Sequence, residues 1–237
     1  MVTDPSGVRL ALLASPLLGP AVWARVAAEL RARGWEVVQP AAYPPVTDPS
    51  EVLAHLVREL PGDLPLVLVP HSNAGLYAGA LAAALPVAAV VFADAGLPAE
   101  ASTTPSAPHE FRDFLATLAG ADGFLPPWTH WWPVEETAAL FPDESARAAV
   151  EREQQRLPLS YFDGAVPSPA GWEKLPAAYL AFGDAYAAER AAATARGWPA
   201  RTLAGGHLLP LAEPEAVSTA IEGLLGLVVP PRRPPRP

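Results

Sequence analysis

Residues 64–75 read Leu-Pro-Leu-Val-Leu-Val-Pro-His-Ser-Asn-Ala-Gly, and this stretch decides the fold. The apolar run at 64–69 predicts a strand buried on both faces of a sheet, because it lacks the alternation of a half-solvated strand. An alanine-rich segment at 73–85 predicts a helix that follows after a very short turn. Strands and helices that alternate in this way build parallel sheets, so the stretch indicates an α/β fold with Ser72 at the turn.

Strand and helix alternate over most of the chain. Further strands are expected at 8–14, 35–39, 87–93, 177–182 and 200–203, and further helices at 22–33, 48–60, 187–196 and 214–225. This order predicts one α/β domain over 1–237, a mostly parallel twisted sheet with helices on both faces. Between about 97 and 172, Pro-rich and Trp-rich sequence with short helical stretches predicts a cap insertion. Residues 230–237 are nearly all Pro and Arg, which predicts a flexible, extended tail.

Composition and charge narrow the class of protein. The chain is 51% apolar and 17% charged, which is typical of a globular protein with a sizeable core. A net charge of -9 argues against nucleic acid as a partner, because phosphate binding requires clustered Lys and Arg. The absence of cysteine excludes disulfides and Cys-based metal sites. No signal peptide or long apolar run is visible, so we expect a cytoplasmic protein without membrane contact.

Ser72 is the first candidate for chemistry. A tight turn between strand and helix presents its hydroxyl at the carboxyl edge of the sheet, where it is placed as a nucleophile. The following helix offers the backbone N–H of Asn73 and a partial positive charge, and both would stabilise an oxyanion. The alternative is that Ser72 only caps this helix.

His207 is the second candidate. It stands in the Gly-Gly-His at 205–207, after the last expected strand and before the last helix. Serine is a weak nucleophile until a base takes its proton, and imidazole titrates near neutral pH, so this pair favours nucleophilic catalysis. The alternative is a histidine that caps a turn. The other histidines rank lower: His71 on the opposite side of the turn, His55 on a helix surface, and His109 and His130 in the insertion.

A third residue must orient the imidazole, and two aspartates qualify. Asp94 follows the strand at 87–93 and Asp184 follows the strand at 177–182, so both lie at carboxyl ends of strands. We favour Asp94 as the acid and keep Asp184 in reserve. Either aspartate could instead cap a helix or hold a loop.

Together these features resemble the α/β-hydrolase superfamily over residues 8–225. The resemblance rests on four places: the loop at 14–19 with Trp23 beyond it, the turn at Ser72, the strand end at Asp94, and the Gly-Gly-His. It implies a hydrolase with Ser72 as nucleophile and His207 as base. Asp94 resembles the acid position of haloalkane-dehalogenase-like members. Those enzymes use an aspartate nucleophile, so cleavage of an ester, lactone or thioester is the nearer analogy here.

Two departures from the superfamily concern the turn and the acid. Pro70 and Ala74 occupy the flanking glycine positions of the usual Gly-x-Ser-x-Gly motif. The commonest acid position of the superfamily, three residues after the glycine that ends the strand at 177–182, holds Tyr186 here. A tyrosine cannot replace the carboxylate, which is a further reason to favour Asp94.

A third departure concerns the oxyanion. The superfamily usually takes a second N–H donor from the loop after the first strand, where this chain has Pro16, which has no N–H. The donor must then be Leu17, a shifted loop, or a side chain such as Ser15, and loss of one donor costs about 10²-fold or more in rate. This departure admits a second class of function: a lyase or cyclase of natural-product biosynthesis, or a ligand-binding homologue. The third class of function is a scaffold role, in which the acidic surface and the tail would bind a partner.

Aromatic residues concentrate in the insertion, where Trp128, Trp131 and Trp132 lie close together. The caps of the superfamily cover the serine, so the resemblance implies that these rings line a pocket for a small, mostly apolar substrate. The alternative is that they only pack the cap against the sheet. We expect no metal or organic cofactor, because the histidines lack ligand spacing and no Gly-rich phosphate loop is present. The sequence leaves the oligomeric state open.

Overall fold

The computed structural model describes residues 7–229 and is built on a six-stranded parallel sheet in the order β2-β1-β3-β4-β7-β8. The strands are β1 (Arg9–Leu13), β2 (Val37–Val38), β3 (Leu66–Ser72), β4 (Val87–Ala95), β7 (Ala177–Phe182) and β8 (Ala200–Leu203). All seven residues of β3 are buried, as its continuous apolar run predicts.

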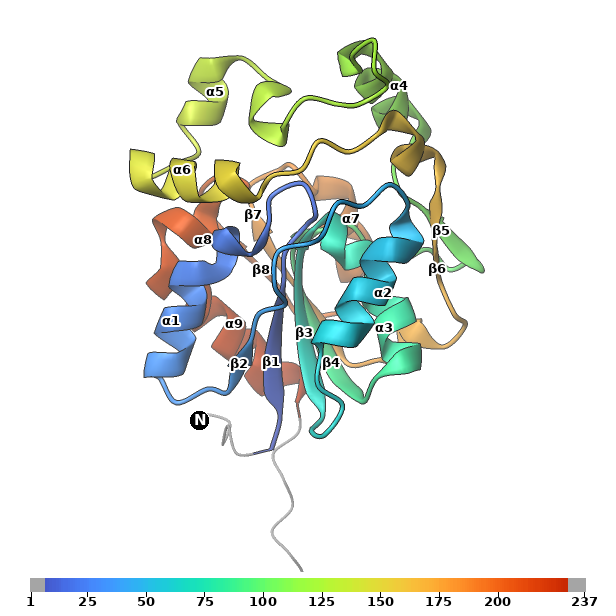
Figure 1. The fold of residues 1–237 in the computed structure, drawn as a ribbon. Coiled ribbons are helices and arrows are strands. Elements are labelled where there is room, and N and C mark those ends of the chain that lie inside the picture. The colour runs from blue at the N-terminus through green and yellow to red at the C-terminus, as the bar shows by residue number, and fades with distance from the viewer. Residues whose placement is uncertain (1–6, 230–237) are drawn as a thin grey trace, which may run out of the picture.

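Helices cover both faces of the sheet, so the predicted fold class is confirmed (Figure 1). Figure 1 shows α1 (Ala24–Ala32) and α9 (Pro214–Val228) on one side, and α2 (Pro49–Glu59) and α3 (Ala78–Ala84) on the other. Two 3-10 turns, η1 (Pro20–Trp23) and η2 (Asn73–Tyr77), lead into α1 and α3. The last elements are α7 (Ala187–Ala195), which packs on β7, and α8 (Leu209–Ala212).

Strands β3 and β4 extend past their predicted ends at 69 and 93, and this places Pro70 inside β3. Proline has no N–H to donate to a ladder, so it is poorly tolerated in the middle of a sheet. In the register of β1 with β3, however, Pro70 lies opposite Leu13, the last residue of β1. The proline therefore stands where the ladder with β1 ends.

The segment between β4 and β7 lies over the carboxyl ends of the main strands. It contains a two-stranded antiparallel sheet of β5 (Thr103–Pro105) and β6 (Ala165–Pro167). Its helices are α4 (His109–Leu118), α5 (Val134–Ala138) and α6 (Glu144–Glu153), with 3-10 turns η3 (Trp128–His130), η4 (Leu159–Asp163) and η5 (Trp172–Lys174). Figure 1 shows α4, α5 and α6 above the edge of the sheet at which Ser72 ends β3.

The expectation that His55 lies on the surface is wrong. His55 is only 3% exposed, because the chain after β2 covers this face of α2. Its Nε2 atom lies 3.0 Å from the carbonyl oxygen of Ala41, and its ring packs 4.8 Å from the ring of Tyr43. Helical periodicity alone could not reveal this, since the covering segment has no regular structure of its own.

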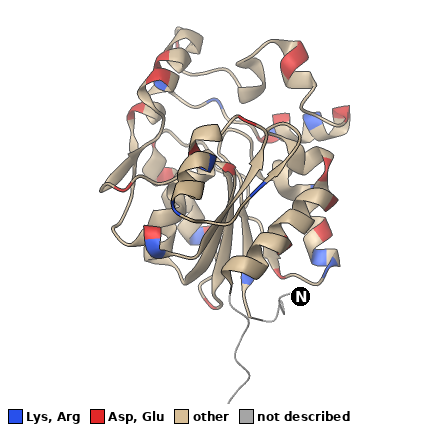
Figure 2. Cartoon of the chain, turned by 180° about the vertical axis from the view of Figure 1, so that it is seen from behind, with Lys and Arg blue, Asp and Glu red and all other residues tan. Residues whose placement is uncertain are grey.

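The surface carries charges of both signs. On the side seen in Figure 2, Asp and Glu residues are interspersed with Lys and Arg, and no area of that side is predominantly basic. Along residues 7–229, no helix has both the length and the apolar character to cross a bilayer. The tail predicted at 230–237 lies outside the described residues.

Candidate active site

Ser72 occupies a strained turn at the end of β3. Its backbone has φ 60° and ψ -132°, a region that residues with a side chain rarely adopt. The turn reverses the chain sharply into η2 and leaves Ser72 at the wall of a cavity. A serine held in such a conformation at the carboxyl edge of the sheet has the placement expected of a nucleophile.

Gly75 lets η2 approach β4 closely, and this contact supports the turn. A Cβ atom at this position would lie 2.0 Å from the carbonyl oxygen of Gly96, which is backbone and has no easy way to move. We therefore expect Gly75→Ala to lower the free energy of unfolding by about 1–3 kcal/mol, as overpacking does in other cores. Urea denaturation measures the loss. Gly62→Ala is the matched control, because a Cβ there meets nothing within 4 Å. Equal stability of the two variants would contradict this account of the turn.

His207 pairs with Asp94. The Nδ1 atom of His207 lies 2.7 Å from Oδ2 of Asp94, whose side chain is fully buried. The other carboxylate oxygen, Oδ1, accepts a hydrogen bond of 3.1 Å from the backbone N–H of Phe182. An ionised carboxylate only accepts, so Nδ1 of His207 carries the hydrogen and Nε2 is left free to take a proton. Asp94 also has a positive φ of 45°, a second strained residue in the site.

The structure separates the two candidate acids. The Asp184 side chain is 87% exposed and forms an ion pair of 3.1 Å with Arg190 on the next helix. Its carboxylate therefore faces solvent, and the geometry does not support its use as the reserve acid. Both aspartates follow a strand in the sequence, but Asp94 still belongs to β4 and reaches His207 from within the sheet.

The sequence gives His71 no role in the chemistry, yet in the structure it contacts His207 directly. The two rings stack with centroids 4.4 Å apart, and Nε2 of His71 donates a 2.9 Å hydrogen bond to the carbonyl oxygen of His207. Burial and the neighbouring His207 lower the pKa of His71 well below its usual value, so its ring is neutral. His71 thus supports the loop that carries His207. His109 and His130 lie in the cap and are exposed.

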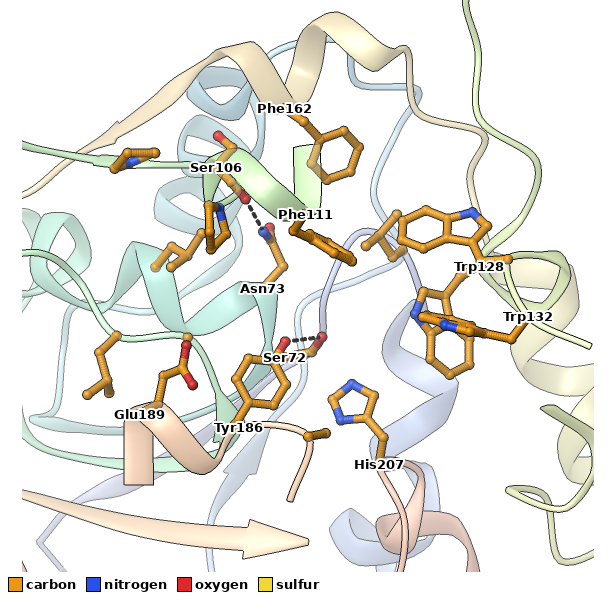
Figure 3. A pocket seen from close by; sticks show the side chains of 18 of the residues that line it. Ser72, Asn73, Ser106, Phe111, Trp128, Trp132, Phe162, Tyr186, Glu189 and His207 are labelled. Atoms are coloured by element: carbon orange, nitrogen blue, oxygen red, sulfur yellow. Dashed lines mark hydrogen bonds between the residues drawn. The ribbon is translucent and has the colours of Figure 1, made fainter. Parts of the chain in front are cut away.

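Tyr186 is the residue that sequence reasoning set aside and the structure brings into the site. Its hydroxyl lies 3.2 Å from Oγ of Ser72, and its ring stacks on His207 at 5.6 Å. Within residues 7–229, this is the one hydrogen bond that Oγ of Ser72 makes, and none joins it to His207. Figure 3 shows the three side chains around one point of the cavity wall.

The candidate oxyanion donors differ in their surroundings. The N–H of Leu17 donates to the Ser15 hydroxyl at 3.2 Å, so it is already engaged. Asn73 is held through its side chain: Nδ2 donates to the carbonyl oxygen of Ser106 at 3.2 Å, and Oδ1 accepts from the Tyr161 hydroxyl at 3.1 Å. These bonds fix the first residue of η2, and with it the direction of the Asn73 backbone N–H.

A cavity of about 750 Å³ lies between the sheet edge and the cap. Ser72, Tyr186 and His207 face it from the sheet side, and the tryptophans singled out from the sequence line it from the cap. Two of these, Trp128 and Trp132, also pack against each other with centroids 5.0 Å apart, so they have a structural role as well. The aromatic lining includes Trp131 and, as labelled in Figure 3, Phe111, Trp128, Trp132, Phe162 and Tyr186.

Acidic side chains contribute to the polar part of the cavity wall. Glu189, on α7, is half-buried there, and burial raises the pKa of its carboxyl group, with a smaller contribution from the charge of Asp94. No ion pair to Glu189 occurs within the described part of the chain, and no lysine or arginine lines the cavity there. Glu136 lies at the cap side of the same cavity. Among residues 7–229, no group of three or more potential ligands is arranged to hold a metal ion.

Comparisons with known proteins place this geometry in a known fold. No family model and no curated protein matches the sequence. An extracellular α/β-hydrolase from a Paenibacillus species matches with a TM-score of 0.69 at 16% identity, over 92% of this chain and 98% of that one. Polyneuridine aldehyde esterase matches with a TM-score of 0.65 at 17% identity, over 93% and 99%. Tomato methylketone synthase I, in complex with 2-tridecanone, matches with a TM-score of 0.60 at 16% identity, over 94% and 99%. This chain adopts the α/β-hydrolase fold.

Proposed function

We propose that this protein is a serine hydrolase that cleaves an ester, lactone or thioester of a small, mostly apolar molecule through an acyl-enzyme. The observation that carries the proposal is the pairing of His207 with the buried carboxylate of Asp94 at 2.7 Å, next to Ser72 in the cavity wall. A base held in this way beside a serine is what acyl transfer through a covalent intermediate requires.

In the proposed reaction, Oγ of Ser72 bonds to the substrate carbonyl carbon while its proton passes to Nε2 of His207. Asp94 accepts the Nδ1–H throughout and stabilises the imidazolium that forms. His207 then gives the proton to the leaving alcohol or thiol as the bond between it and the carbonyl carbon breaks. Water attacks the acyl-enzyme in the second half, its proton goes to His207, and the same proton returns to Oγ of Ser72 as the acid departs.

The oxyanion would be held by two backbone N–H groups. The first is that of Asn73, whose side chain is fixed at both ends. The second is that of Leu17, which lines the cavity and would exchange the hydroxyl of Ser15 for the substrate oxygen. Such an exchange replaces one neutral acceptor with a negatively charged one, which forms a stronger hydrogen bond.

The cavity supports a small, mostly apolar substrate. A volume of about 750 Å³ is within the range of small-molecule sites, and its walls are largely aromatic and aliphatic. One structural neighbour is described as an esterase, which is in keeping with ester cleavage. The acyl and alcohol groups would be recognised mainly through buried apolar area.

Charge on the cavity wall yields a prediction about substrate preference. At a pH above the raised pKa of Glu189, we expect a monoester of a dicarboxylic acid to be cleaved about tenfold less efficiently than a neutral ester of equal length, because the Glu189 carboxylate repels the free carboxylate. Glu189→Gln should narrow this difference in kcat/KM. Asp184→Asn removes an equal charge that is 87% exposed, so it should leave the preference unchanged. If Glu189→Gln kept the wild-type preference for the neutral ester, repulsion by Glu189 would not be its cause.

The experiment that tests the proposed function is labelling with a fluorophosphonate, followed by intact mass measurement and peptide mapping. We expect one adduct, on Ser72, and a large loss of labelling in His207→Ala. Turnover of short p-nitrophenyl esters completes the test. A folded protein that neither labels at Ser72 nor cleaves any of these esters would exclude the serine hydrolase.

The second candidate is a non-hydrolytic enzyme of this fold, a lyase or cyclase. Two observations favour it: Pro16 lacks a donor, and the N–H of Leu17 is engaged with Ser15. One structural neighbour is described as a methylketone synthase. In such an enzyme His207 would act as the acid or base without a covalent step at Ser72. Retention of turnover in Ser72→Ala would favour this candidate.

A further inference from the structure

We infer that Tyr186 is a catalytic residue whose hydroxyl donates a hydrogen bond to Oγ of Ser72 while that atom carries negative charge. The inference rests on the proposed acyl-enzyme mechanism and adds a third group that acts on the reacting oxygen. Its basis is the 3.2 Å distance between the two hydroxyl oxygens and the absence, within residues 7–229, of any other hydrogen bond for either.

The direction of this hydrogen bond follows from acidity. Both hydroxyls lie in the same cavity wall, and in equal surroundings a phenol is more acidic than an aliphatic alcohol, so the Tyr186 hydroxyl is the better donor of the two. When Tyr186 donates, the single proton of Ser72 is free to point elsewhere, and the mechanism requires it to point at Nε2 of His207. If Ser72 donated instead, its single proton would be bound to the phenol oxygen, and Nε2 of His207 would have no proton to accept.

The surroundings of Tyr186 keep it a neutral donor. Burial raises the pKa of its hydroxyl far above the usual value and outweighs the hydrogen bond with Ser72, which lowers it, while the nearby charges of Asp94 and Glu189 raise it further. The phenol therefore stays protonated over the whole working range of a histidine base. Its ring lies 5.6 Å from the imidazole of His207 at an interplanar angle of 28°, so the stack limits where the hydroxyl can point.

The position of Tyr186 at the start of α7 explains why it reaches the serine. Tyr186 is the N-cap residue of α7, in the loop that follows β7. Asp94 already fills the acceptor position at His207, so this loop need not supply a carboxylate. The side chain of Tyr186 points toward Ser72 instead, as Figure 3 shows.

The hydrogen bond from Tyr186 would stabilise negative charge on Oγ of Ser72 in two steps of the reaction. As His207 removes the serine proton, negative charge develops on Oγ before the bond to carbon is complete. As the acyl-enzyme breaks down, Oγ leaves the carbon with the bonding electron pair and takes its proton from His207. Tyr186 keeps its own proton in both steps and stabilises the charge by hydrogen bonding, which is worth most in a site closed to water.

The test is Tyr186→Phe, which keeps the ring and its stack on His207. We expect kcat and the rate of fluorophosphonate labelling to fall together by about 10- to 100-fold, with KM changed by less than about threefold. Thr194→Ala, which removes an exposed hydroxyl from α7 outside the cavity, is the matched control and should keep wild-type rates. In the Ser72→Ala background, Tyr186→Phe should produce no further loss, because its target atom is gone.

The outcomes separate this inference from the proposed function. If wild type labels at Ser72 and Tyr186→Phe reacts equally fast or faster, the inference fails and the serine hydrolase stands. If wild type does not label, the proposed function fails first. Should Tyr186→Phe not fold, 3-fluorotyrosine introduced at position 186 alone keeps the hydroxyl and makes it more acidic. A labelling rate that does not respond to that change would equally overturn the inference.

Discussion

Replacing Ser72 with alanine is expected to lower kcat for any ester that the wild-type protein cleaves by about 10⁴-fold or more. The reason is that Oγ of Ser72 forms the covalent bond, and no other hydroxyl in the described structure combines a strained turn with a base oriented by a carboxylate. Fluorophosphonate labelling should disappear in the same variant. Steady-state kinetics and intact mass measurement check both expectations.

Ser218→Ala is the matched control for this change. Ser218 is fully buried in α9, and its Oγ has no hydrogen-bond partner in the described structure, so the substitution removes the same atom at little cost. We expect wild-type kinetics from it. Turnover that survives in Ser72→Ala would instead assign the chemistry to His207 alone and favour a lyase or cyclase.

Asp94→Asn carries the second largest expected effect, a fall in kcat of about 10³- to 10⁴-fold. The amide oxygen of Asn could still accept from the N–H of Phe182, which bonds Oδ1 of Asp94 in the native protein. The amide nitrogen would then face Nδ1 of His207 and force that atom to accept. Nε2 of His207 would carry the hydrogen and could no longer take the proton of Ser72.

The control again is Asp184→Asn, which changes the other strand-end aspartate and leaves His207 untouched. Thermal unfolding of both variants separates a loss of catalysis from a loss of folding. The assignment of Asp94 would be wrong if Asp184→Asn lost activity while Asp94→Asn kept it. A comparable loss in both would indicate an indirect effect through the loops at this edge of the sheet.

The amino-acid sequence by itself determined the sheet, its helices and two residues of the candidate site. Continuous apolar runs identify the central buried strands without reference to distant residues, and the alternation of strands and helices places the outer ones. A residue at the end of such a strand, or in the loop that follows it, lies at the carboxyl edge of a parallel sheet. For this reason Ser72 and His207 could be named together, although they stand 135 positions apart in the sequence.

The tertiary structure alone decided which side chains touch. Asp94 and Asp184 both follow strands, and the choice between them depends on the backbone of Asp94, with its φ of 45°, and on an ion pair that turns Asp184 to solvent. The contact of Tyr186 with Ser72, the stacking of His71 on His207 and the burial of His55 likewise depend on loops. Loop conformations are set by long-range packing and have no periodicity, so residue patterns carry no record of them.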